Sequence, residues 1–236
     1  MEPNRFATQS TAQTRTYDEG LRAHMTSIYN RMTLGVLVTA ITAFFVSGSP
    51  ALLNFFLGGP QAYLVMLAPI GIVMFGFNPA RMDSQKLKAA FFAISVLYGI
   101  SLSVILIVYT GENIARAFFI AAGMFAGLSI FGYTTKKNLS MVGTFCVMAM
   151  WGLLVMSLLN TFIFKDAGMY DLMSYASIAI FSGLTAWETQ SAKMQYSAGH
   201  GSEGNSRMAW SSALSLYISF IAIFLNILRL MGGNRG

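Results

Sequence analysis

FFAISVLYGISLSVILIVY, the stretch from Phe91 to Tyr109, is apolar on every face and carries no charge. A helix needs about 20 such residues to cross a hydrocarbon layer of roughly 30 Å. A strand of a membrane barrel would instead alternate apolar and polar side chains over about ten positions. Because backbone groups cannot stay unpaired in lipid, this stretch predicts a helix that crosses a membrane.

Similar apolar stretches recur along the whole chain. Of its 236 residues, 55% are apolar and only 10% are charged, which leaves too little charge to coat a soluble fold. We therefore predict an all-α polytopic membrane protein embedded in a lipid bilayer. Its seven predicted transmembrane helices lie at residues 32–48, 61–78, 89–109, 114–133, 140–163, 173–192 and 209–231.

The predicted organisation is a membrane domain at residues 32–231 between an N-terminal segment, 1–31, and a short tail, 232–236. Residues 1–16 are polar and lack periodicity, so we expect them to be disordered. The next part predicts a short interfacial helix, because apolar residues recur there at spacings of three and four, namely Leu21, Met25, Ile28 and Met32. A helix that binds a partner is the alternative interpretation of this segment.

The basic residues predict the orientation in the membrane. Translocated loops are poor in Lys and Arg, so the side that holds most of them is cytoplasmic. With the N-terminus inside, that side holds eleven of the fifteen, which are Arg5, Arg15, Arg22, Arg31, Arg81, Lys86, Lys88, Lys136, Lys137, Lys193 and Arg207. The scatter of these residues through short loops argues against binding to nucleic acid.

The sequence contains no motif for a cofactor or an enzyme. The two histidines, His24 and His200, lie outside any HExxH or similar metal-binding pattern. The glycine-rich stretch at 197–205 lacks the order of a phosphate-binding loop. No pairing of a nucleophile with a base is recognisable, so we expect no catalytic activity and no cofactor.

Gly123 and Gly127 form a GxxxG pattern within the fourth predicted span. Small residues one turn apart allow two helices to approach closely. We predict that these glycines pack inside the bundle, with a dimer interface as the alternative.

Glu188 is the only acidic residue inside a predicted span. A carboxylate in a membrane costs several kcal/mol unless it is paired, hydrated or protonated, so such a residue indicates a functional site. The alternative is that Glu188 is wetted at the cytoplasmic interface and paired with Lys193.

Three stretches in order resemble the bacterial branch of the Bax inhibitor-1, or lifeguard, family. They are YTGENIARAFFIAAGMFAGLSIFGYTTKKNLS (Tyr109–Ser140), GLTAWETQ (Gly183–Gln190) and ALSLYISFIAIFLNILRLMG (Ala213–Gly232). The resemblance implies seven helices with the last surrounded by the other six, in a bacterial inner membrane. It also implies a calcium leak whose opening depends on pH through two aspartates that share a proton. Some bacterial relatives are linked instead to control of a membrane protease.

The chain departs from the family pattern at this two-aspartate site. Glu188 replaces the aspartate of the LTAYDTQ pattern, and Ser219 replaces that of LYLDFIN. Asn226, two turns beyond Ser219, keeps the same face of the last helix polar. A serine cannot share a proton as a second carboxyl would, so the proton switch implied by the family is not available here.

Two functional hypotheses follow from these residues. The first is a calcium or cation leak with Glu188 at its centre and Ser219, Asn226 and Asn160 as polar lining. Arg81 is the candidate for the gating arginine of the family, although an ordinary cytoplasmic charge explains it better. The second is a non-conducting regulator that binds another membrane protein, such as a membrane protease.

Overall fold

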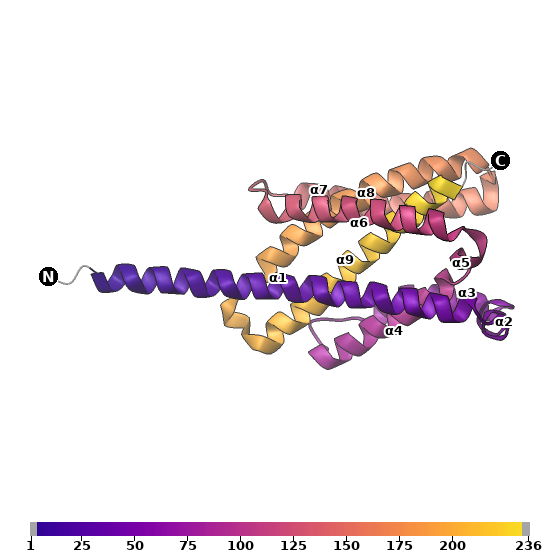
Figure 1. The fold of residues 1–236 in the computed structure, drawn as a ribbon. Helices are drawn as coiled ribbons and strands as arrows, with labels where there is room; N and C mark the ends of the chain where they lie inside the picture. Colours follow the sequence, from indigo (N-terminus) through magenta and orange to yellow (C-terminus); the bar gives the residue numbers. More distant parts are fainter. Residues whose placement is uncertain (1–3, 233–236) are drawn as a thin grey trace.

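A computed structural model describes residues 4–232 of the chain, and all regular elements within this range are helices (Figure 1). In chain order they are α1 (Asn4–Ser47), α2 (Pro50–Leu57), α3 (Gln61–Gly71), the π-helix η1 (Ile72–Gly76), α4 (Ser84–Leu102), α5 (Ile105–Val108), α6 (Gly111–Thr134), α7 (Ser140–Leu159), the π-helix η2 (Asn160–Phe164), α8 (Ala167–Gln195), the short 3₁₀ helix η3 (Ala198–His200) and α9 (Gly201–Gly232). The predicted all-α class is therefore confirmed for the described residues.

Five helical stretches are long and apolar enough to cross a membrane. They are Tyr17–Ser47, Ser84–Val108, Gly111–Thr134, Ser140–Phe164 and Gly201–Gly232. A sixth candidate is the pair formed by α2 and the α3–η1 stretch, which is bent by 73°. α8 overlaps the predicted span at 173–192 but is not among the candidates, because Ser, Thr, Gly and Glu188 dilute its apolar residues. The described residues thus give five or six candidate spans where the sequence predicted seven.

Side-chain caps mark several of the helix starts. Asp83 accepts a hydrogen bond from the backbone N–H of Lys86 at 2.9 Å, and Asp166 accepts one from Gly168 at the same distance. Thr110 caps α6 in the same way. Such residues satisfy backbone donors that have no partner within the helix. They therefore fix where α4, α6 and α8 begin.

The N-terminal segment differs from the prediction. α1 is one unbroken helix from Asn4 to Ser47, so the disorder expected at residues 1–16 is not found from Asn4 onward. The helix predicted around residues 21–32 runs directly into the first span within α1. The physical reason is that residues 4–19 contain neither Gly nor Pro and include several strong helix formers. Residues 1–3 and most of the predicted tail lie outside the described residues.

The loops that connect the helices lie at two opposite ends of the bundle. The loops before α4, after α6 and after α8 lie at the end from which α1 enters (Figure 1). The α1–α2 turn, the α5–α6 turn, the α7–α8 corner and the end of α9 lie at the other. The segments with most of the basic residues are therefore at one end, as the predicted orientation requires.

α9 is the central helix of the bundle. It crosses diagonally between α6, α7 and α8 on one side and α3 and α4 on the other (Figure 1). Its principal contacts are with α1, α4, α6 and α8, whereas α3 packs mainly on α4 and α7 mainly on α8. Half of the residues in its most apolar stretch are buried, a larger share than in any other candidate span of the described residues. The principal neighbours of α9 are thus four helices.

Glycines away from the GxxxG pattern allow the closest helix approaches. A Cβ atom at Gly132 would overlap the backbone carbonyl of Ala186, so α6 and α8 touch there. Gly99 plays the same part between α4 and α1, where a Cβ atom would lie 2.8 Å from the carbonyl oxygen of Thr39. Gly123 and Gly127 are exposed, and a Cβ atom at either would meet nothing within 4 Å. The prediction that they pack inside the bundle is wrong, because their face of α6 turns outward.

Replacement of Gly132 by Ala should destabilise the bundle, because the backbone of α8 cannot move aside as a flexible side chain would. We expect the free energy of unfolding to fall by about 1–3 kcal/mol, as for other overpacked cores. Thermal unfolding in detergent measures this change. Gly127→Ala on the same helix is the matched control and should leave the stability unchanged or slightly higher. Equal effects of both variants would contradict the assigned packing of α6.

Candidate functional site

Glu188 lies in the C-terminal half of α8 and is partly buried. Every other acidic side chain that the structure describes is exposed. α8 continues to Gln195, seven residues beyond Glu188, which corresponds to about 10 Å of helix. Glu188 is therefore the one acidic side chain among the described residues that is not exposed.

Ser219 of α9 is the partner of Glu188. Its Oγ donates a hydrogen bond to Oε2 of Glu188 at 2.8 Å, and the serine side chain is only 1% exposed. A hydrogen bond to a charged group is stronger than one between neutral groups. The structure thus joins the two residues that the sequence placed at corresponding positions on the sixth and last spans.

The alternative pairing of Glu188 with Lys193 is not observed. The Lys193 ammonium donates instead to the backbone carbonyl of Tyr133 at 3.0 Å. It also lies 4.7 Å from the centre of the Tyr133 ring, within range of a cation–π contact. Lys193 therefore links α8 to the end of α6 and leaves Glu188 to Ser219.

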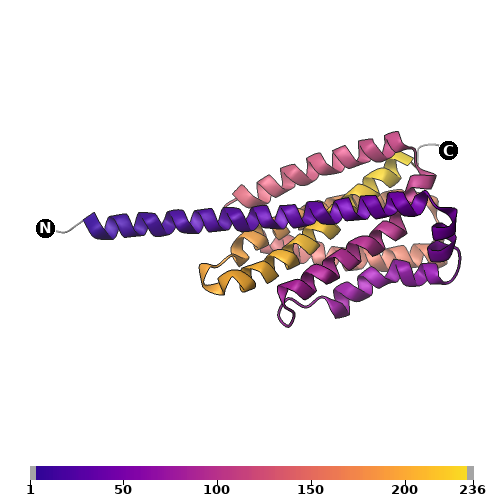
Figure 2. The same cartoon turned by 60° about the horizontal axis from the view of Figure 1, so that its bottom comes forward.

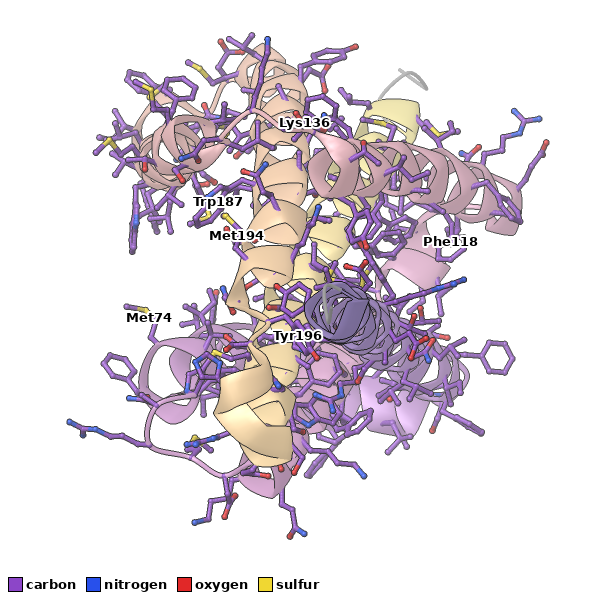
Figure 3. All side chains as sticks on the ribbon, turned by 90° about the vertical axis from the view of Figure 1, so that its left-hand side faces the viewer. Met74, Phe118, Lys136, Trp187, Met194 and Tyr196 are labelled. Carbon is purple, nitrogen blue, oxygen red and sulfur yellow. The ribbon has the colours of Figure 1, made fainter. Side chains whose placement is uncertain are left out.

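Close packing holds α8 in place around the site. Gly132 of α6 meets the backbone of Ala186, and Gly143 of α7 leaves room for the Trp187 ring. Figure 3 shows Trp187 on the side of α8 that faces α7. Two consecutive positions of α8 thus rest on glycines of two different helices. Glu188, the next residue, points toward α9, where Ser219 lies.

Gln190 fastens the same helix to the loop between α6 and α7. Its Oε1 accepts a hydrogen bond from the backbone N–H of Leu139 at 2.8 Å, and its Nε2 donates to the carbonyl of Lys137 at 2.9 Å. Sequence reasoning missed this residue. The signal in the sequence was the amide itself, which lies within the predicted span at 173–192, where a polar side chain must find partners.

The other predicted site residues lie elsewhere. The Asn226 amide donates to the carbonyl of Ala222 on its own helix at 2.8 Å. Asn160 is fully buried at the α7–α8 corner, where its side chain exchanges two 3.1 Å hydrogen bonds with the backbone of Asp166. Arg81 is exposed in the loop before α4. Among the described residues, none of these three side chains is hydrogen-bonded to Glu188.

The chemistry open to this site is that of one carboxyl and one hydroxyl. Within residues 4–232, no group of three or more His, Cys, Asp or Glu residues is placed to hold a metal ion. Calcium prefers six to eight oxygen ligands, so the pair cannot retain it as a resident ion. It can attract a passing cation, or it can bind and release a proton.

Comparisons with known proteins agree on one family. The family described as "Inhibitor of apoptosis-promoting Bax1" matches residues 21–236. A protein of Rickettsia prowazekii is 34% identical over 96% of each chain, and one of Caulobacter vibrioides is 38% identical over 92% of this chain and 91% of its own. The inner membrane protein YbhL of Escherichia coli is 34% identical, over 92% of this chain and 94% of its own.

Replacement of Ser219 by Ala should destabilise the protein, because the Glu188 carboxyl would lose its partner. We expect a loss of about 1–3 kcal/mol in the free energy of unfolding. Ser215→Ala, one turn earlier on α9, removes a hydroxyl that is not bonded to Glu188 and should cost less than about 0.5 kcal/mol.

A double-mutant cycle separates the hydrogen bond from other effects of the change at Ser219. In a Glu188→Ala background, Ser219→Ala should cost far less than in the wild type. If Ser219→Ala costs the same in both backgrounds, the assigned pairing is incorrect.

Proposed function

This chain belongs to the Bax inhibitor-1 family, and from that premise we propose that it is a cation leak pathway centred on Glu188 and Ser219. Like its relative YbhL, it is a multi-pass protein of the bacterial inner membrane. The observation that carries the proposal is the 2.8 Å hydrogen bond between α8 and α9. It lies inside the bundle at Glu188, the only acidic side chain among the described residues that is not exposed.

The proposal includes seven crossings with the N-terminus in the cytoplasm. α8 then serves as the sixth span despite its polar content, because it is covered by α6, α7 and α9 and needs little lipid-facing surface. The bent α2–α3–η1 segment supplies the second crossing. An ion that crosses the bundle between α8 and α9 would pass the Glu188 carboxylate. Calcium is the cation that the family implies.

The composition of this site suits the passage of calcium better than its tight binding. One carboxylate and one hydroxyl offer too few oxygens to hold calcium tightly. Conduction requires binding strong enough for entry and weak enough for release. The proposal is therefore one of transport without catalysis, in which Glu188 supplies the charge and Ser219 positions the carboxylate.

A non-conducting regulator of another membrane protein is the second candidate. The observation that favours it is α1, whose N-terminal part extends beyond the other helices (Figure 1). A protein partner, such as a membrane protease, would then bind this projecting helix. Crosslinking in native membranes would capture the same partner from the wild type and from Glu188→Gln.

Glu188→Gln should abolish calcium flux into proteoliposomes. The amide keeps the shape of the side chain but removes the charge, so we expect a fall of at least about tenfold. Ser215→Ala is the control and should conduct like the wild type. If the purified wild type carries no more calcium than empty liposomes between about pH 5 and 8, the leak proposal fails and the regulator remains.

Ser219→Asp should divide the pH dependence of the flux into two steps. Two neighbouring carboxyls cannot both ionise cheaply, so they share a proton and the pair titrates with two separate apparent pKa values. The wild type, with one carboxyl, should respond in a single step. The measurement is initial calcium flux across the same pH range, with Ser219→Asn as the neutral control. An unchanged profile in Ser219→Asp would rule out the shared-proton explanation.

A further inference from the structure

A cleft runs along the bundle between α1 and α6. The two helices lie along the same side of the protein without a principal contact between them (Figure 2). The cleft has a volume of about 640 Å³, and its floor includes Phe220 of α9. Phe118 marks the α6 wall on the side of the bundle away from Trp187 (Figure 3). A cavity of this size lies within the usual range for bound small molecules.

The cleft has the length of a lipid chain. Along α1 it extends from Arg22 to Val36, which is about 21 Å of helix, and one leaflet of a bilayer is roughly 15 Å deep. Beyond Phe118 and Phe220 a second apolar cavity of about 370 Å³ continues between the same helices. Most of the surface that lines both cavities is aliphatic or aromatic.

One end of the cleft is polar and positively charged. Arg22 is the only charged residue in its lining. Arg22 and Thr26 also line an adjoining shallow cavity of about 590 Å³, which Glu19, Asn30 and Arg31 complete. The Arg31 guanidinium is bonded to Ser206 and lies over the Trp210 ring of α9, so Arg22 supplies the positive charge at the mouth of the cleft. An apolar cleft with an arginine at its mouth matches an amphiphile with an anionic head.

A deeper polar group faces the same cleft. Ser129 of α6 lines it and is only 6% exposed. Its Oγ has no hydrogen-bond partner among the described residues. A buried hydroxyl without a partner is uncommon in a folded protein. The oxygen itself has almost no exposed surface, so it stabilises no ligand in the cleft as the cleft stands.

We propose that the α1–α6 cleft binds one anionic phospholipid. The phosphate pairs with Arg22 at the mouth of the cleft, and an acyl chain fills the space between α1 and α6. The site is separate from Glu188, which does not line the cleft. A neutral lipid, or a helix of another protein, would leave the Arg22 guanidinium without an anionic partner.

Native mass spectrometry of the purified protein in detergent tests this site. The probes are phosphatidylglycerol and phosphatidylethanolamine at equal concentration. We expect one phosphatidylglycerol to bind more tightly than phosphatidylethanolamine, and Arg22→Gln to weaken its binding by about tenfold. Lys88→Gln, the same change at an exposed position of α4, should bind it like the wild type.

A second pair of variants tests the apolar part of the site. Ala126→Phe places a ring in the cleft and should abolish retention of the lipid. Ala179→Phe, on an exposed position of α8, should not. Size-exclusion profiles and helical circular dichroism show whether each variant is folded. Glu188→Gln should bind the lipid normally.

Several outcomes would overturn the proposal. Equal binding of the two lipids would show that the cleft does not select an anion. Equal effects of Arg22→Gln and Lys88→Gln would assign the preference to general surface charge. Full retention of phosphatidylglycerol by folded Ala126→Phe would place the lipid outside the cleft.

Discussion

A carboxyl group inside an apolar bundle costs several kcal/mol unless it is hydrogen-bonded, hydrated or protonated. The arrangement around Glu188 follows from that constraint. α8 must approach α9 closely enough for one serine to reach the carboxyl, and the 2.8 Å bond shows that it does. The position of α8 depends in turn on Gly132 and Gly143, because a Cβ atom at Gly132 would overlap the backbone of Ala186 and one at Gly143 would overlap the Trp187 ring. The glycines that set the position of α8 therefore also help to position the Glu188 carboxyl.

The apolar spacing was sufficient to predict most of the fold. Long uninterrupted runs must be helices in lipid, so the positions of α4, α6 and α7 could be placed to within a few residues. Hydropathy identifies α8 less clearly, because Ser, Thr, Gly and Glu188 lie among its apolar residues. It also cannot show which face of a helix points inward. The orientation of Gly123 and Gly127 was therefore misjudged, since GxxxG favours close packing without naming the partner.

The candidate site was predictable in part. The family pattern placed Glu188 on the sixth span and Ser219 on the last. In the structure a hydrogen bond joins these two residues. Asn160 was chosen as a polar residue in an apolar segment, and Asn226 because it shares the face of Ser219. Such residues often bond to nearby backbone, as Asn160 does at the α7–α8 corner, where Lys165 adopts a left-handed conformation with φ of 53°. Sequence alone cannot separate an amide that lines a path from one that holds a turn.

One hydrogen bond connects the cleft to the carboxyl site. Tyr29 of α1 lines the cleft, and its hydroxyl lies 3.4 Å from Oγ1 of Thr189, the residue after Glu188. A ligand between α1 and α6 would contact the helix that makes this bond. Any shift of α1 would then be felt at α8, because packed helices move as rigid elements. A lipid in the proposed site would thus contact α1 at Tyr29, whose hydroxyl meets α8 one residue from Glu188.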